Sequence, residues 1–277
     1  VVAPGSYIKS AALITDEQFA AKDVCRETYK SGTSMAAPLA AGSIALIRQY
    51  FVDGYHPNGI QNIQNAFNPS AALLKAVVVN GAQALRGLNS DGFPLEPPPS
   101  CRQGWGRVNV ARSVRLPDAN AYEKDYAFIA LDRVSDPLVK AGQTYGVCLQ
   151  VIGNTEEFRA TLVWTDPPAS VVSDGSIVND LDLKLFHKKA GTIVQTLWPL
   201  PGQEDRENNV ERVVWSSPDV GRYYLEVTAH RIQQAQTFSL AVTGQVVLLH
   251  DGETDENRCY DINYAVKIPP PPSPSPP

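Results

Sequence analysis

Long hydrophobic runs and strongly basic blocks are both missing from this 277-residue sequence. Its longest apolar stretch, Leu39 to Ile47, is interrupted by Gly42 and Ser43, whereas a membrane-spanning helix needs about 20 predominantly apolar residues. The 24 Lys and Arg residues face 29 Asp and Glu residues, so the formal charge is −5. The sequence therefore predicts neither a membrane span nor a nucleic-acid partner, because a nucleic acid would require a basic surface.

Cysteine is scarce, and its spacing argues against a zinc site. The four cysteines, Cys25, Cys101, Cys148 and Cys259, form no C-x-x-C pair. An even number permits two disulfides with three connectivities if the protein is secreted. The sequence also has no initiator methionine and no signal segment, and it opens with a strand-like apolar run from Val1. We therefore expect further residues upstream.

The first 117 residues predict an α/β domain with two apolar helices. The segment from Ser34 to Phe51 has Arg48 as its sole charge, so it is expected to be a buried helix. A second helix is expected from Ser70 to Leu85, with Pro69 in or next to its first turn. We expect this domain to end at residue 117.

Residues 118–248 predict an all-β sandwich or jelly-roll domain. Short β-branched and aromatic runs recur there, separated by turn residues. The eight expected strands are Tyr126–Leu131, Thr144–Val151, Phe158–Trp164, Leu181–Phe186, Ile193–Trp198, Val210–Trp215, Arg222–Ala229 and Thr237–Val242.

Residues 249–277 predict a polar and proline-rich tail. Seven of its last nine residues are proline, which favours an extended polyproline II spacer over a packed core. The simpler interpretation is a linker. The alternative is attachment to a cell wall or matrix, because the tail resembles the hydroxyproline-rich segments of plant and green-algal cell-wall glycoproteins.

The most informative segment runs from Ser31 to Pro38, at the start of the first predicted helix. A hydroxyl at such a helix start is exposed at the positive end of the dipole, and its backbone N–H can hold a developing oxyanion. Gly32 allows the chain to approach a substrate closely. These physical features alone favour an N-capping role for Ser34, which is the commoner use of serine at this position.

The string Gly32-Thr33-Ser34-Met35-Ala36-x-Pro38 resembles the catalytic-serine signature of the subtilisin-like serine proteases. Val2–Gly5, Asn68–Ala76 and Gly104–Val108 resemble further segments of that family, and several β-rich segments up to about residue 244 are similar to the C-terminal sandwich of bacterial alkaline subtilases. The resemblance implies a parallel-sheet catalytic domain, a protein or peptide substrate, and Ser34 as nucleophile and backbone oxyanion donor. Gly32, Thr33 and Met35 would lie at the substrate cleft.

The same resemblance places the catalytic Asp, the catalytic His and the oxyanion Asn before the serine. The four histidines of this sequence all follow Ser34, namely His56, His187, His230 and His250. We expect ordinary surface or strand roles for them. Without a general base the Ser34 hydroxyl is a poor nucleophile, so the chain alone should be inactive.

An acidic cluster predicts a calcium site, although carboxylates at such positions are more often turn residues. Alternation along a strand puts Asp180 and Asp182 on one face, and Asp205 and Asn208 offer further oxygen ligands. The resemblance supports calcium, since related sandwich domains bind it structurally.

Together these features predict a secreted or cell-wall serine endopeptidase. The alternative is a non-catalytic module that binds the extracellular matrix. If the protein is secreted, Cys25 with Cys101 and Cys148 with Cys259 is one expected pairing, and partners upstream are an equal alternative.

Overall fold

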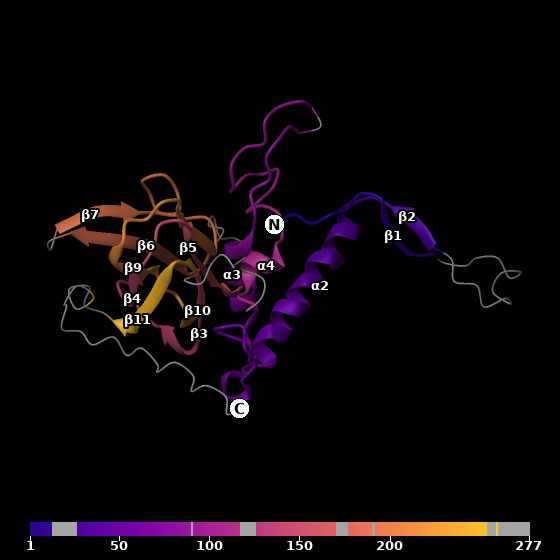
Figure 1. Ribbon diagram of the computed structural model, residues 1–277. Helices are drawn as coiled ribbons and strands as arrows, with labels where there is room; N and C mark the ends of the chain where they lie inside the picture. The colour runs from indigo at the N-terminus through magenta and orange to yellow at the C-terminus, as the bar shows by residue number, and fades with distance from the viewer. Residues whose placement is uncertain are drawn as a thin grey trace, which may run out of the picture.

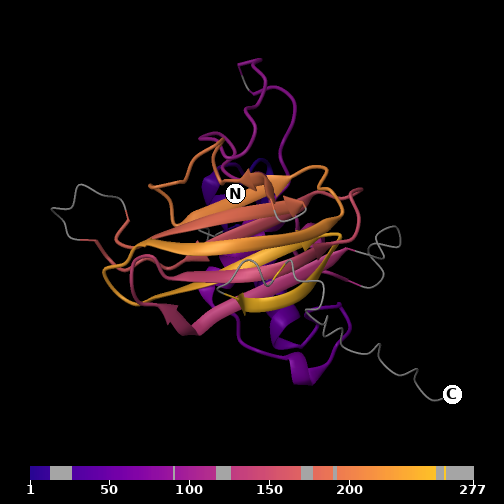
Figure 2. The same ribbon diagram turned by 90° about the vertical axis from the view of Figure 1, so that its left-hand side faces the viewer.

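The computed structural model describes residues 1–12, 27–89, 91–116, 126–169, 177–189, 192–253 and 259. Nine strands among these residues form two antiparallel sheets, which we call the two-sheet region (Figures 1 and 2). The four-stranded sheet has the order β3 (Ala127–Leu138), β10 (Gln236–Gly244), β5 (Phe158–Trp164) and β8 (Val210–Trp215). The five-stranded sheet has the order β11 (Val246–Glu253), β4 (Thr144–Val151), β9 (Gly221–Arg231), β6 (Asp180–Lys189) and β7 (Thr192–Leu197).

The four-stranded sheet is covered on both faces, which follows from the alternation of its side chains. Leu162 and Leu240 point into the core shared with the five-stranded sheet. Their neighbours Val163 and Ala241 point the other way, into a second core formed with the helices. This double burial is why every residue of β5 except Arg159, and every residue of β10 except Thr237, is buried.

Three helices lie on the outer side of this sheet: α2 (Thr33–Val52), α3 (Ala71–Gly81) and α4 (Val110–Ser113). Helix α3 contacts β10, β5 and β3, and α2 stands beyond α3, away from the sheets (Figure 1). Ser70 caps α3, because its side chain accepts a hydrogen bond from the Leu73 N–H. The helix ends at Gly81, four residues before the predicted end.

Contacts at both ends hold α3 against the four-stranded sheet. At its start, the carboxylate of Asp132 on β3 accepts hydrogen bonds from the Ser70 N–H at 2.8 Å and the Ser70 hydroxyl at 2.7 Å. At its end, Arg159 Nη1 on β5 donates to the carbonyls of Asn80 and Ala82 at 3.0 and 2.8 Å. Arg212 Nη1 on β8 donates to the Val79 carbonyl at 3.0 Å.

The predicted burial of the first helix is wrong for most of its length. Helix α2 forms as expected, but its buried residues are Ile47, Tyr50 and Phe51. Leu39 and Leu46 are 42% and 59% exposed, because the described elements cover only the last turns of the helix.

By length and composition α2 could also cross a membrane. Core helices share these properties, so the expected absence of a membrane span stays a prediction.

The expected parallel sheet of the first domain does not form among the described residues. There, Val2 makes an isolated parallel bridge with Arg107 instead of a strand, and β1 (Ile8–Ala11) pairs with β2 (Glu27–Lys30) in an antiparallel hairpin. Residues 104–108 belong to no helix or strand.

All eight predicted strands are present, and three of them have the predicted bounds: β4, β5 and β8. A ninth strand, β11, was missed. It pairs with β4 and continues to Glu253, so the segment expected to begin the polar tail at residue 249 starts inside a sheet. The proline-rich part of that prediction lies outside the described residues.

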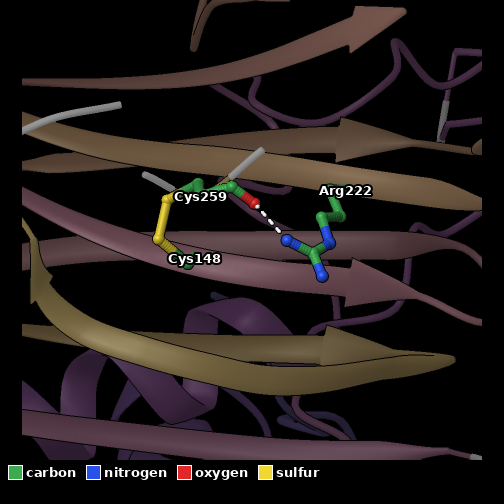
Figure 3. Close-up of a disulfide and its surroundings, with 3 residues drawn as sticks. All are labelled: Cys148, Arg222 and Cys259. Atoms are coloured by element: carbon green, nitrogen blue, oxygen red, sulfur yellow. Dashed lines mark hydrogen bonds between the residues drawn. A yellow bond between two sulfur atoms is a disulfide. The ribbon is translucent and has the colours of Figure 1, made fainter. Parts of the chain in front are cut away.

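One of the two expected disulfides is present. Cys148 on β4 is bonded to Cys259, and Arg222 Nη1 donates to the Cys259 carbonyl at 3.2 Å (Figure 3). Both cysteines are buried. Cys101 is an exposed thiol with no disulfide partner among the described residues. Its expected partner Cys25 lies outside those residues, so that pairing stays a prediction.

Candidate functional site

Ser34 is the second residue of α2, in a first turn that is set by two glycines. Gly32 adopts φ +151°, a conformation that favours glycine, and its N–H donates to the Gly5 carbonyl at 2.7 Å. A Cβ on Gly5 would lie 2.8 Å from the Gly32 carbonyl oxygen. Two segments that are distant in sequence therefore pass closely here, and a side chain at either glycine would disturb the approach.

The Ser34 side chain is exposed and its backbone polar groups are available. The N–H groups of Met35 and Ala36 donate to the Gly32 carbonyl, whereas within the described ranges the Ser34 N–H has no acceptor. Pro38 lacks the N–H that would normally bond the Ser34 carbonyl one turn earlier. Ser34 itself does not cap the helix, because Gly32 occupies the N-cap position. The structure therefore removes the capping role that local physics alone favoured.

A hollow of about 380 Å³ lies beside this turn, between the chain start and α2. Gly32 and Thr33 line it together with Val1–Ala3 and Gly5. Two of the three residues expected at a substrate cleft therefore share one depression. Met35 and Ser34 are not in its wall, although they belong to the same helical turn.

None of the four histidines lies beside Ser34. His56 packs against Phe51 at the other end of α2, with ring centroids 5.5 Å apart. Because a helix rises 1.5 Å per residue, Phe51 is roughly 25 Å from Ser34. His187, His230 and His250 lie on β6, β9 and β11, in the five-stranded sheet beyond α3 and the four-stranded sheet.

His56 is not an ordinary loop histidine. Its ring lies among Phe51, Phe67 and Phe128, and its buried Nε2 has no hydrogen-bond partner among the described residues. Burial lowers the pKa of His56 to about 4, and a hydrogen bond with the Phe128 backbone offsets part of that shift. Its ring is therefore neutral at physiological pH.

The residues expected to bind calcium do not form an oxygen shell. Arg206 Nη1 lies between the two buried carboxylates of β6: it donates to Asp180 Oδ2 at 3.2 Å and to Asp182 Oδ1. A guanidinium at this position supplies the compensating charge and repels a second cation. The sequence offered one signal for it, namely an arginine inside the acidic stretch Glu204–Glu207.

The other two expected ligands are bonded to each other. Asp205 accepts hydrogen bonds from the Glu207 N–H and from the Asn208 side chain. Burial raises the pKa of nearby Glu211 to about 9, so its carboxyl is protonated at neutral pH. No three His, Cys, Asp or Glu side chains of the described chain are grouped as a metal site. As they are placed, these residues do not fit calcium.

Comparison with known proteins gives an independent view of the region around Ser34. Residues 1–106 match the subtilase family of peptidases. The chain is 30% identical to the serine protease/ABC transporter B family protein tagD of Dictyostelium discoideum over 78% of its own length, and 29% identical to tagA of the same organism over 80%. It is 28% identical to the PI-type proteinase of Lactococcus lactis subsp. cremoris over 54%.

The chain spans only 14%, 13% and 8% of the lengths of these three relatives. Since 78–80% of the chain is more than its first 106 residues, the similarity to the two Dictyostelium proteins continues into the two-sheet region. The family match contains the glycine-flanked turn, Ser34 and the apolar helix behind it. Through residues 1–106, this chain belongs to the subtilase family.

Proposed function

We propose that the protein is a serine endopeptidase in which Ser34 forms the acyl-enzyme. The observation that carries the proposal is the exposed Ser34 in the first turn of α2, with an N–H that no described residue accepts. The hydroxyl attacks the scissile carbonyl, the peptide C–N bond breaks, and the acyl group is transferred to Oγ. The Ser34 N–H, at the positive end of the helix dipole, donates to the developing oxyanion.

The proton on the Ser34 hydroxyl needs an acceptor that this chain does not supply. All four histidines belong to other parts of the fold, so a histidine and its carboxylate partner would have to come from outside the 277 residues. The 277-residue chain by itself is therefore proposed to be inactive. The peptide substrate would lie along Gly32, Thr33 and Met35 and enter the hollow that Gly32 and Thr33 line.

A fluorophosphonate probe tests the assignment. The 277-residue chain should not be labelled, whereas a longer protein that carries this chain and the two missing groups should be labelled at Ser34. Ser34→Ala should abolish labelling and lower kcat by roughly a factor of 10⁶, the loss measured when the serine of subtilisin is removed. Ser43→Ala is the matched control, because that hydroxyl lies on the same helix and donates to the Leu39 carbonyl.

The result also separates the enzyme from its alternative, a non-catalytic module that binds the extracellular matrix. The placement of every histidine away from Ser34 favours that alternative if the longer protein is not labelled. Near-normal turnover in a longer Ser34→Ala protein would show that the nucleophile is wrongly assigned.

We further propose that the two-sheet region is a jelly-roll sandwich and that the protein works outside the cell or in the cell wall, where the proline-rich tail attaches it to the matrix. The buried Cys148–Cys259 disulfide supports this location, because disulfides persist in oxidising compartments. Mass mapping of the non-reduced protein tests it, and free thiols at both positions would contradict it.

A further inference from the structure

A second hollow, of about 570 Å³, lies between residues 83–112 and the beginning of strand β5. Its wall contains four guanidinium groups and one carboxylate, hence a net charge of three positive units, in a chain whose formal charge is −5. We call it the arginine hollow. The residues that matter here are Arg86, Arg107, Arg112, Arg159, Glu157 and Gln83.

Four separate chain segments build the arginine hollow, and hydrogen bonds fix their positions. Gln83 and Arg107 are paired through their backbones in both directions, with N–H to carbonyl distances of 2.9 and 2.8 Å. Arg112 lies on α4, and Arg159 lies on β5, where it also holds the end of α3. The positive groups are therefore brought together by the fold and do not depend on a flexible loop alone.

Most of this charge has no internal compensation. The one carboxylate, Glu157, already accepts from Arg159 Nε at 2.5 Å, and Arg112 Nη2 is 3.9 Å from the same oxygen. Arg107 Nη2 donates to the neutral Gln83 Oε1 at 2.8 Å. Arg86 is exposed, and its side chain has no partner among the residues that the structure describes. The guanidinium groups of Arg86, Arg107 and Arg112 therefore line the hollow with N–H donors that no described residue accepts.

We propose that the arginine hollow binds a doubly charged tetrahedral oxyanion, phosphate or sulfate, through Arg86, Arg107 and Arg112. A guanidinium offers parallel N–H donors whose spacing matches two oxygens of such a group. Gathering like charges costs free energy that a dianion offsets more fully than a monoanion. The volume far exceeds that of a bare ion, so the hollow also has room for a small molecule that carries the anion as an ester.

Isothermal titration calorimetry of the 277-residue chain tests the proposal. Sodium sulfate and sodium phosphate should bind, and sodium acetate at the same ionic strength should bind at least ten-fold more weakly. Glucose 6-phosphate and glucose 6-sulfate distinguish the sources. Tighter binding of the esters than of the free ions identifies an ester as the ligand, and equal or weaker binding identifies the free ion.

Arg86→Gln and Arg107→Gln should each weaken dianion binding about ten-fold, the usual effect of removing one charged hydrogen-bond donor. Arg48→Gln removes the same charge from an exposed position on α2 and should leave the affinity unchanged. Circular dichroism verifies that each variant is folded. Absence of dianion binding, equal binding of acetate, or an equal loss in Arg48→Gln would each overturn the proposal.

Discussion

Replacement of His56 by phenylalanine should remove one defined contribution to the pH dependence of stability between pH 6.5 and pH 4. The ring already lies among Phe51, Phe67 and Phe128, so phenylalanine preserves the shape and the apolar contacts. It also removes the buried Nε2 that has no partner among the described residues. The substitution also loses the hydrogen bond with the Phe128 backbone. Because this loss opposes the gain from removing the unpartnered Nε2, we expect little net change in stability at pH 7.

The sign follows from where the proton binds. The His56 pKa is lowered from 6.5 to about 4 in the folded state, so between these values the unfolded chain binds more protons. The contribution is full above pH 6.5 and is lost as the pH falls toward 4. At 1.36 kcal/mol per pKa unit the loss has a ceiling of about 3 kcal/mol. Because the ring is only partly buried, we expect about 2 kcal/mol.

Urea denaturation at half-unit steps from pH 7.5 to 4 measures this effect as a difference between the wild type and His56→Phe. Carboxylates titrate in both proteins, so the difference isolates the histidine. His230→Gln, at an exposed position on β9, is the matched control and should retain the wild-type slope. Parallel curves for the wild type and His56→Phe would refute the argument.

Three further variants test other parts of the fold. Arg206→Ala should lower the free energy of unfolding by about 3 kcal/mol, because it leaves Asp180 and Asp182 buried without the guanidinium that pairs with both. Millimolar calcium should raise the melting temperature of this variant, whereas wild-type melts with calcium and with chelator should coincide. Asp132→Ala should lower the free energy of unfolding by about 2 kcal/mol, measured by urea denaturation, since it removes three hydrogen bonds and a charge at a helix start. Cys148→Ser should cost about 3 kcal/mol in the same assay, because the disulfide closes a span of 111 residues.

The strands could be predicted from sequence because their signal is local. Runs of β-branched and aromatic residues between turn residues fix where a strand begins and ends, as at β4, β5 and β8. Strand β11 was missed because polar residues His250 and Asp251 follow its apolar start, yet its edge position tolerates them. The burial of α2 could not be predicted, since burial depends on which other elements cover a helix and not on its own composition.

The candidate site divides in the same way. The helix that starts next to Ser34 could be predicted from contiguous residues, whereas the contact of Gly32 with the distant Gly5 and the N-cap position of Gly32 could not. The partner of Asp180 and Asp182 could not be predicted, because Arg206 comes from a separate loop. A pattern of acidic residues does not show whether a metal ion or an arginine neutralises their charge. The aromatic environment of His56 is also assembled from distant segments, including Phe128 on β3.

The contacts of α3 mean that the two-sheet region helps to hold residues 1–106, the part of the chain that matches the subtilase family, in place. The helix dipole is positive at its start, where Asp132 accepts from Ser70, and negative at its end, where Arg159 and Arg212 donate to carbonyls. All three charged side chains belong to strands of the four-stranded sheet, whose outer face also buries the apolar side of α3. The last turns of α2 pack in that same core, so the sheet supports the helix that carries Ser34 through its far end. A change in the two-sheet region can thus alter the candidate site without touching it.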